Sequence, residues 1–450
     1  MTGHDLIARG FEPGPWFKDA LMVANHMEAG GAPLSAIIEA VKKMQPVEPP
    51  VIPTQRALSV QTHFNISPQN EDEFQNVEQV RHTMHELLRT PTIRAASVMP
   101  DACPAGPLGT IPVGGVVKAE NAVHPGMHSA DICCSVAMTI LDRSVSLKRV
   151  LDAAMNDGTH FGGGRRSFNP VKPGARLLHR FSDNQFLQGL EDIAKMDMAT
   201  QGDGNHFFYV GTLLSTGEAV IVTHHGSRRP GALLYKLGMN AAEKFRRKIS
   251  PDTLKGNAWI PMDTQEGADY WEALQIIRQW TKQNHFGIHD TVMKELGVEA
   301  SDRFWNEHNF VFERDGFYYH GKGATPAWQG FADDPDVHPE VLIPLNMAEP
   351  ILIVRGNDAA HGLGFAPHGA GRNYSRAEHN RRTNDRTEDV VERETRGLDV
   401  RFWTGVPDTS ELPSAYKSAE SVRNQIEQYE LATPVDMVMP YGTIMAGRRR

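Results

Sequence analysis

The sequence predicts a mixed α/β (α+β) fold with a single large domain and mixed sheets, and three observations support this. Short apolar runs such as AVIVTHH, VLIPL and ILIVRG alternate with turns that contain glycine or histidine, which is typical of strands ending in polar loops. The segment VEQVRHTMHELLRT (77–90) has the apolar spacing of a helix. The composition, with 40% hydrophobic and 22% charged residues in a chain of 450, is globular and excludes global disorder.

The chain divides into three parts by composition. The apolar spacing in residues 1–45 predicts an N-terminal helical appendage, with two short amphipathic helices around a glycine pair. Residues 46–56 predict a stiff linker, because four of the first eight are proline. Residues 57–450 are expected to form the large domain. Within that domain, the charge-rich segment 376–400 predicts a solvated helical stretch.

Several classes of protein are excluded or disfavoured. No run approaches the roughly 18 consecutive apolar residues of a membrane span, so no membrane association is expected. The three cysteines, Cys103, Cys133 and Cys134, cannot form a disulfide framework, and no secretory signal is readable. We therefore expect a cytoplasmic protein. The net charge of −9 argues against indiscriminate coating of nucleic acid but is compatible with a local basic groove; protein partners are unknown.

Metal-type side chains gather beside predicted strands. Asp131 and Cys134 stand three residues apart before one strand, His206 enters a second, His224 ends a third and His308 lies beside a fourth. One carboxylate, one thiolate and several imidazoles could form a transition-metal site, and a thiolate can bridge two cations. The long separations lack the spacing of a CxxC or HExxH motif, so ordinary hydrogen-bonded histidines are an equally good interpretation.

The string FAPHGAGRNYSR (365–376) predicts an anion-binding loop. Small residues after His368 let main-chain N–H groups approach a phosphate, and Arg372 and Arg376 could hold its oxygens. A histidine before such a loop could attack phosphorus as a nucleophile. A glycine turn with structural arginines is the alternative interpretation. Further anion-binding features occur at GSRRPG and HGKG, which contain Arg228 and Lys322.

Together these motifs resemble the RtcB family of GTP- and manganese-dependent RNA ligases, in order from about residue 78 to the C-terminus. VMPDACPAGPLGTIPVGGVVKA is similar to the family's MPD-x-H-x-G segment, SADICCSVA to FDINCGVR, GDGNHFF to G-x-GNHF, and THHGSRRPG to HSGSRGLG. The strings HN (308–309), HGKGATPA, HGAGR and AYKS (415–418) complete the series. The resemblance implies an RtcB-like domain around a central metal cleft.

The resemblance also implies roles for individual residues. Asp131, Cys134 and His206 would hold one Mn2+, and Cys134, His224 and His308 a second, with the thiolate as bridge. His368 would be the catalytic histidine that becomes guanylylated. The GMP moiety would be surrounded by Asn205, Asn346, Met347, His368, Gly369, Ala370, Gly371, Arg372 and Tyr416. Arg228 and Lys322 would face RNA phosphates.

By this resemblance the protein would join an RNA 3′-phosphate, or a 2′,3′-cyclic phosphate, to a 5′-hydroxyl, using GTP, in RNA repair or tRNA splicing. Two alternatives stay open. A manganese-dependent phosphatase or phosphodiesterase on RNA ends would keep the metals but not the nucleotide. A non-catalytic RNA-binding relative would keep the metals only as structure.

The sequence departs from the family pattern at positions that bear on the nucleotide. Cys103 stands where the pattern has histidine, and Tyr209 where it has glutamate. The loop PLNMAEP (344–350) replaces a small-residue loop with a bulkier leucine and an acidic glutamate. Ala446 stands where the pattern has a lysine, which predicts weaker capture of GTP.

Overall fold

In a computed structural model the chain forms two compact units, Met1–Ile52 and Pro53–Arg450. The structure describes residues 1–14, 16–45, 50–142, 144–162, 166, 169–328, 330–331, 339–383 and 386–448. Residues 46–49 of the predicted linker lie outside the described residues, and its remaining residues 50–56 have no helix or strand. The assignment of separate roles to 1–45, 46–56 and 57–450 stays a prediction.

The N-terminal unit contains three helices, α1 (Gly3–Ile7), α2 (Phe17–Ala29) and α3 (Leu34–Met44). The sequence pattern indicated only two, because α1 has five residues and is too short to show a period. A capping box between Thr2 and Asp5 forms α1 instead: the Thr2 main chain donates to the carboxylate, and its hydroxyl accepts from the Asp5 N–H.

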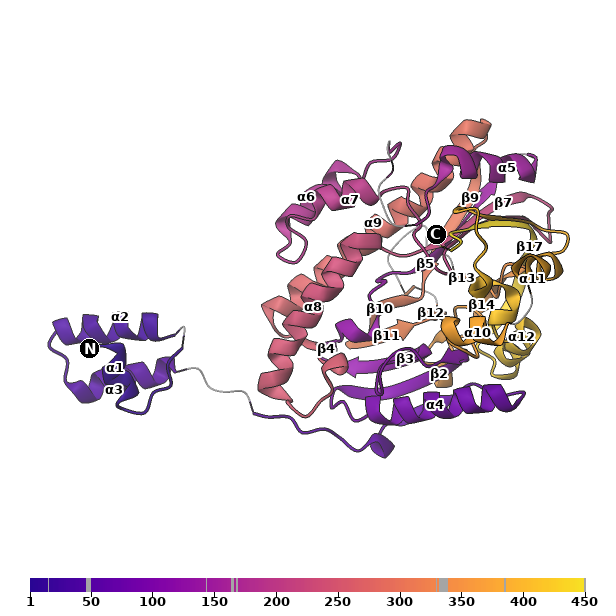
Figure 1. Cartoon of the computed structure of the whole chain (residues 1–450). Coiled ribbons are helices and arrows are strands. Elements are labelled where there is room, and N and C mark those ends of the chain that lie inside the picture. The colour runs from indigo at the N-terminus through magenta and orange to yellow at the C-terminus, as the bar shows by residue number, and fades with distance from the viewer. Residues whose placement is uncertain are drawn as a thin grey trace. The chain divides into compact units, whose positions relative to one another are not determined.

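The second unit mixes helices and sheets, which confirms the predicted fold class (Figure 1). Its α-helices are α4 (Glu71–Leu87), α5 (Leu147–Ala153), α6 (Ala175–Asp183), α7 (Glu191–Asp197), α8 (Arg228–Ile249), α9 (Gln265–Leu296), α10 (Arg376–Arg382), α11 (Thr387–Glu394) and α12 (Ala419–Gln428). The helix expected at 77–90 begins at Glu71, because the Asn70 side chain accepts from the Glu73 N–H and so caps its start.

The strands lie in two main sheets. The smaller has the order β1 (Gln61–Phe64), β2 (Ile93–Cys103), β3 (Val113–Glu120), β11 (Phe317–Lys322), β10 (Asn309–Arg314). The larger has the order β13 (Glu340–Ile343), β14 (Ile351–Gly356), β17 (Ala432–Met445), β6 (Phe207–Leu213), β7 (Ala219–His225), β5 (Ser135–Leu141), β9 (Ala300–Glu307), with β16 (Asp399–Phe402) parallel to β17. Two further pairs are β12 (Ala324–Pro326) with β15 (Phe365–Pro367), and β4 (Ala122–Val123) with β8 (Ile260–Pro261).

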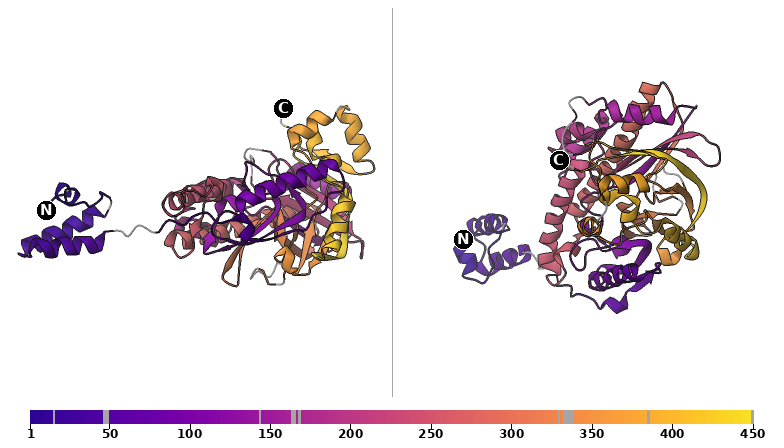
Figure 2. Two further views of the ribbon diagram at one scale, coloured as in Figure 1. Left: turned by 90° about the horizontal axis from the view of Figure 1, so that it is seen from below. Right: turned by 45° about the vertical axis from the view of Figure 1, so that its right-hand side comes forward.

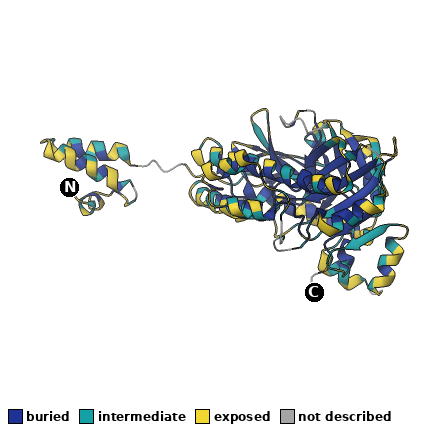
Figure 3. Cartoon of the chain, turned by 90° about the horizontal axis from the view of Figure 1, so that it is seen from above, coloured by how far each residue is buried: buried dark blue, intermediate teal, exposed yellow. Residues whose placement is uncertain are grey.

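Helices cover the sheets from several sides. In Figure 1, α8 and α9 run along one side of the strands, while α4 lies beneath β2 and β3. The main apolar core joins side chains from α8, α9 and both sheets, so the two sheets share one interior. Figure 3 shows the strands buried in the middle of the unit, with the exposed residues on the outer faces of the helices.

The charged segment 376–400 forms two helices and a strand rather than one helical stretch. α10 and α11 are separate helices, and β16 begins at Asp399. Figure 2 shows these gold-coloured helices projecting from the surface of the unit, as their charge predicts. Among the described residues, no helix has the length and apolarity needed to cross a membrane.

Candidate metal centre and adjoining cavity

The metal-type residues meet because four neighbouring strands of the larger sheet bring their ends together. In the order β6, β7, β5, β9, the antiparallel registers pair Phe207 with His224 and Val136 with His224. His206 immediately precedes β6, and His308 immediately follows β9. The His308 N–H also donates to the Cys134 carbonyl over 3.0 Å, so the main chain fixes the two ligand-bearing turns to each other.

A tight turn before β5 places Asp131 and Cys134 on the same side. The Cys134 N–H donates to the Asp131 carbonyl over 3.2 Å, and Cys133 between them has a left-handed φ of +56°. Gly226 packs directly on the Asp131 carboxylate, where any Cβ would overlap the oxygen atoms. Glycine is therefore required at 226 for the carboxylate to reach the cluster.

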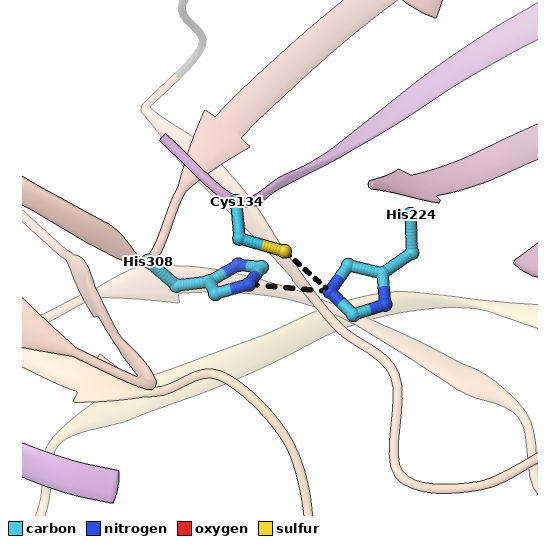
Figure 4. A group of neighbouring side chains, drawn as sticks. All are labelled: Cys134, His224 and His308. Carbon is cyan, nitrogen blue, oxygen red and sulfur yellow. Dashed lines mark hydrogen bonds between the residues drawn. The ribbon is translucent and has the colours of Figure 1, made fainter. Parts of the chain in front are cut away.

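Two groups of three side chains converge, and Cys134 belongs to both. Asp131, Cys134 and His206 form one group, and Cys134, His224 and His308 the other, with the ligand atoms of each within 4.8 Å of one another. Cys134 Sγ lies 3.2 Å from His224 Nε2, and this atom lies 3.2 Å from His308 Nε2 (Figure 4). Ligands of a four-coordinate metal stand about 3–4 Å apart, given bonds of about 2.0–2.3 Å. The donor set thus fits two cations that share one sulfur atom.

The main chain orients two of these imidazoles. His206 Nδ1–H donates to the Gln201 carbonyl over 2.6 Å, and His224 Nδ1–H donates to the Asn205 carbonyl over 3.0 Å. This arrangement fixes the tautomer and leaves each Nε2 lone pair directed at the cluster. In His206 that atom lies 3.0 Å from the Asp131 carboxylate and 3.6 Å from Cys134 Sγ.

The electrostatics favour ligands that are neutral or anionic. Burial, followed by the nearby His368, lowers the pKa of His224 and of His308 well below the usual range, so both rings are neutral. Burial would raise the pKa of the Asp131 carboxyl, but the close contact with His206, 3.0 Å away, holds it at about 2. Burial and then Asp131 raise the pKa of the Cys134 thiol, so metal binding has to displace its proton.

His368 lies against the second group of ligands. Its imidazole stacks on that of His308, with ring centroids 3.4 Å apart and planes 15° apart, and lies 5.1 Å from that of His224. The residue follows β15, and its N–H donates to the Gly323 carbonyl. Its Nδ1 is buried and has no hydrogen-bond partner among the residues that the structure describes. The ring therefore joins the candidate metal centre to the space beside it.

That space is a cavity of about 670 Å3. It is lined by every residue that the resemblance assigns to GMP: Asn205, Asn346, Met347, His368, Gly369, Ala370, Gly371, Arg372 and Tyr416. Gly371 has a φ of +70°, and a Cβ there would overlap the Asp101 carbonyl, so the turn after His368 requires glycine. Sequence reasoning thus predicted a set of residues that the fold brings to one place.

One carboxylate, which the sequence analysis missed, organises the arginines of the cavity. Glu411 is 2% exposed and accepts from Arg372 Nη2 over 2.5 Å, from Arg376 Nε over 2.6 Å and from the Tyr416 hydroxyl over 2.6 Å. Arg372 also donates to the Ser410 carbonyl and packs over the Tyr416 ring. Glu411 stands far along the chain from the HGAGR string, and no motif marks it.

Two further residues of the cavity escaped the sequence analysis. Asp101 is 1% exposed, and its Oδ2 accepts from the Gly369 N–H over 3.3 Å. The side-chain amide of Asn76, on α4, donates to the Arg372 and Asn373 carbonyls. Asp101 had a signal, because it belongs to the MPD string that carries the resemblance; Asn76 had none.

The two residues expected to face RNA do not line the cavity. Arg228 lies beside the first metal group, where its Nε donates to the Thr200 hydroxyl and its charge acts on Asp131. The Lys322 ammonium donates to the carbonyls of Ala105 and Ile111, and burial lowers its pKa to about 8. In this conformation Lys322 supports the 105–111 loop.

Of the departures from the family pattern, Tyr209 lines the cavity, whereas Glu349 and Ala446 are not among its lining residues. Tyr209 is 2% exposed, lines the cavity and donates its hydroxyl to the Val438 carbonyl. The Glu349 carboxylate, the acidic group of the 344–350 loop, forms an ion pair with Arg423 at 3.3 Å. Ala446 packs in an apolar cluster with Phe208, Ile444 and others, whereas its neighbour Met445 lines the cavity.

The sequence matches a family model described as "tRNA-splicing ligase RtcB" over residues 175–446. It is 27% identical over 294 residues to the tRNA-splicing ligase RtcB of Archaeoglobus fulgidus, covering 56% of this chain and 60% of that protein. It is 26% identical over 338 residues to that of Thermococcus kodakarensis, covering 65% and 69%. It is 25% identical over 345 residues to the RNA-splicing ligase RtcB of Escherichia coli strain K12, covering 69% and 81%.

Proposed function

The chain belongs to the RtcB family, and from this premise we propose that it is an RNA ligase that works through a guanylylated histidine. It joins an RNA 3′-phosphate, or a 2′,3′-cyclic phosphate opened to it by water, to an RNA 5′-hydroxyl in RNA repair or tRNA splicing. One observation supports this most strongly: His368 stacks on the candidate metal ligand His308 and also lines the cavity. We assign this chemistry to residues 57–450 and give residues 1–45 no role in it.

Two divalent cations, manganese first among them, fit the two ligand groups. Asp131, Cys134 and His206 would hold one, and Cys134, His224 and His308 the other. When bound, the cations would neutralise phosphate oxygens and stabilise charge in an in-line displacement at phosphorus. The fixed Nδ1 hydrogen bonds of His206 and His224 hold their Nε2 atoms ready, so binding costs little rearrangement.

His368 is the nucleophile of the first step. Burial and then His206 lower its pKa to about 3, so its ring is neutral and a nitrogen lone pair is free near pH 7. That nitrogen attacks the α-phosphorus of GTP. The N–P bond forms, the bond from this phosphorus to the bridging oxygen breaks, and pyrophosphate leaves with the electron pair. The His308 ring, parallel to His368, restricts rotation of the attacking imidazole.

Two further displacements complete the ligation. An oxygen of the RNA 3′-phosphate attacks the phosphorus held on His368, and the N–P bond breaks, which returns the lone pair to the ring. The RNA 5′-hydroxyl oxygen then attacks the 3′-phosphate phosphorus, loses its proton, and displaces GMP. We assign contact with an RNA phosphate near the first metal group to Arg228, whose charge acts on Asp131. Lys322 would need to release its main-chain partners to reach one.

The two arginines after His368, Arg372 and Arg376, have different contacts in the cavity. Both terminal nitrogens of Arg372 donate hydrogen bonds within the protein, to Glu411, the Tyr416 hydroxyl and the Ser410 carbonyl, so this residue stabilises the cavity wall. Arg376 uses its Nε on Glu411, is half exposed, and has its guanidinium beside Gly204, next to Asn205. We assign phosphate contact to Arg376 and a structural role to Arg372, although the sequence pattern offers both.

The test is incubation of the full chain with α-labelled GTP and, separately, ATP in the presence of manganese. We expect acid-labile label on the protein, mapped to His368 by mass spectrometry, and joining of RNA ends that carry a 3′-phosphate and a 5′-hydroxyl. His368→Ala should remove the label while the metals stay bound. His179→Ala, on the exposed face of α6, is the matched control. Label on another residue, or hydrolysis of RNA-end phosphates without label, would contradict the proposal.

A further inference from the structure

A buried chain of hydroxyl and imidazole groups lies behind the candidate metal centre and takes no part in the proposed ligation steps. His285 and His289 stand four residues apart on α9, so both rings face the same part of the larger sheet. Three hydroxyl groups on β5 and β7 meet these rings. All five side chains are 0% exposed: Ser135, Thr139, Thr223, His285 and His289.

Hydrogen bonds occupy all four nitrogen atoms of the two rings. The Thr223 hydroxyl lies 2.7 Å from His285 Nδ1 and 2.8 Å from His289 Nε2. The Ser135 hydroxyl lies 3.0 Å from His285 Nε2. The Thr139 hydroxyl lies 2.7 Å from His289 Nδ1. Burial lowers the pKa of both histidines well below the usual range, so each ring is neutral and carries one N–H.

The protons of this chain have one consistent arrangement. The Ser135 hydroxyl also lies 3.0 Å from the Cys133 carbonyl, which can only accept, so it donates there and accepts from His285 Nε2–H. His285 Nδ1 then accepts from the Thr223 hydroxyl, and that oxygen accepts from His289 Nε2–H. The chain therefore runs in one direction and ends at the turn before β5, and each bond polarises the next.

Two hydroxyl groups of the chain belong to residues that adjoin metal ligands. Ser135 follows Cys134, and Thr223 precedes His224. Successive residues of a strand point to opposite faces, so the hydroxyls face α9 while the ligands face the cluster. His285 bonds to both hydroxyls, so one ring connects β5 to β7 behind the two ligand atoms. Those atoms, Cys134 Sγ and His224 Nε2, lie 3.2 Å apart (Figure 4).

We propose that His285 is a positioning residue that sets the spacing between Cys134 and His224, and with it the affinity of the centre for divalent cations. It is not one of the ligands, and it acts through the two hydroxyl groups that it holds. The His225 ring stacks on it, with centroids 3.5 Å apart and planes 15° apart, which restricts its rotation. The inference rests on the metal centre of the proposed function but not on its nucleotide steps.

The decisive measurement is a Co2+ titration of the metal-free full chain, followed by calorimetry and by the thiolate-to-cobalt charge-transfer band. Thr223→Val keeps the shape of the side chain but removes the hydroxyl. The affinity should then fall by roughly 10- to 100-fold, the usual effect of losing a group that orients a ligand, and the band should shift. Thr223→Ser restores the hydroxyl and should bind Co2+ nearly as the wild type does. Ser135→Ala removes the other hydroxyl and should weaken binding within the same range.

Thr83→Val is the matched control for these variants. The Thr83 hydroxyl, on α4, is also buried and accepts from the Gly109 N–H over 2.8 Å. This variant should lower the melting temperature but leave the Co2+ affinity and the band unchanged. Unchanged affinity in both Thr223→Val and Ser135→Ala would overturn the inference. An equal loss in Thr83→Val would also overturn it, because the effect would then come from general loss of stability.

Nitrogen-15 NMR of the histidine-labelled, metal-free chain tests the hydrogen bonds separately from the metal. We expect the Nε2–H tautomer for both His285 and His289, with His285→Gln and His289→Gln identifying the resonances. The opposite tautomer in either ring would overturn the inference. The expected tautomers together with no charge-transfer band in the wild type would instead contradict the metal centre of the proposed function.

Discussion

The imidazole of His368 lies parallel to that of His308, with the two ring centroids 3.4 Å apart. His308 is a candidate metal ligand and His368 lines the cavity, so this contact joins the two halves of the site. As the proposed nucleophile, His368 is held close to the two candidate metal sites without being one of their ligands. Changes to the ligands and changes to the nucleophile should therefore have separable effects, and the first two predictions concern the ligands.

Cys134→Ser should lose manganese and activity together, because Cys134 belongs to both ligand groups. Cys133→Ser should keep both, since Cys133 is turned away from the cluster toward Glu307 and Thr281. Metal content by mass spectrometry after dialysis, with circular dichroism to check folding, is the measurement. Full metal occupancy in Cys134→Ser would show that the thiolate is not the shared ligand.

Metal affinity should rise with pH by about tenfold per unit around neutrality, which is the dependence of one released proton. Burial and Asp131 raise the pKa of the Cys134 thiol, so this proton is still bound in the metal-free protein. The His224 and His308 rings are already neutral because burial lowers each pKa, and they release none. Calorimetry in buffers of different ionisation enthalpy counts the protons. A count of zero would mean that Cys134 is a thiolate before metal binds.

Nucleotide selectivity should be weak, within about tenfold between GTP and ATP. Strong selection of guanine needs a protein acceptor for its N–H groups. The Glu411 carboxylate and the Tyr209 hydroxyl already have hydrogen-bond partners inside the protein, so neither is free to recognise guanine. Tyr209→Glu should shift labelling toward GTP, whereas Tyr209→Phe, which keeps the ring, should leave the ratio unchanged. Competition between labelled and unlabelled nucleotides measures this. A wild type that prefers GTP by a hundredfold or more would show that another group reads the base.

The metal-type residues could be picked out from the sequence because each stands in a short recognisable string beside the end of a strand. Glu411 and Asn76 could not be found this way, since each acts on the cavity through a contact that depends on the tertiary fold. The long strand β17 was also missed, because Pro434 and Pro440 interrupt its pattern and a bulge near Pro440 shifts its register. The helix α9 escaped because it is buried on several sides and shows little amphipathic contrast.

The lysine that the family pattern has at 446 would not enter the cavity here. Ala446 packs with Phe208 and Ile444, and the alternation of β17 turns Met445 toward the cavity instead. Ala446→Lys should therefore lower the free energy of unfolding by roughly 2–4 kcal/mol, the usual cost of placing a polar group in a packed core. Met445→Lys is the matched variant and should tighten GTP binding. Chemical denaturation and GTP titration measure the two effects. A stable Ala446→Lys protein with tighter GTP binding would contradict this assignment.

Glu411→Gln should separate the two roles of the cavity arginines. The buried carboxylate holds Arg372, Arg376 and Tyr416, so its loss leaves two guanidinium groups without their common anion. Breaking a buried ion pair in this way costs roughly 3–5 kcal/mol of stability. Because Arg376 loses its anchor, the nucleotide concentration at half-maximal labelling should rise several-fold while the rate at saturation changes little.

The control for this prediction is Glu378→Gln. Glu378 also bridges two arginines, Arg381 and Arg382, but it does so on the exposed surface of α10, where such ion pairs contribute less than about 1 kcal/mol. Equal stability loss in both variants would show that the effect comes from helix electrostatics. A lower rate at saturation, with unchanged half-saturation, would place Glu411 in the chemistry of His368 rather than in nucleotide binding.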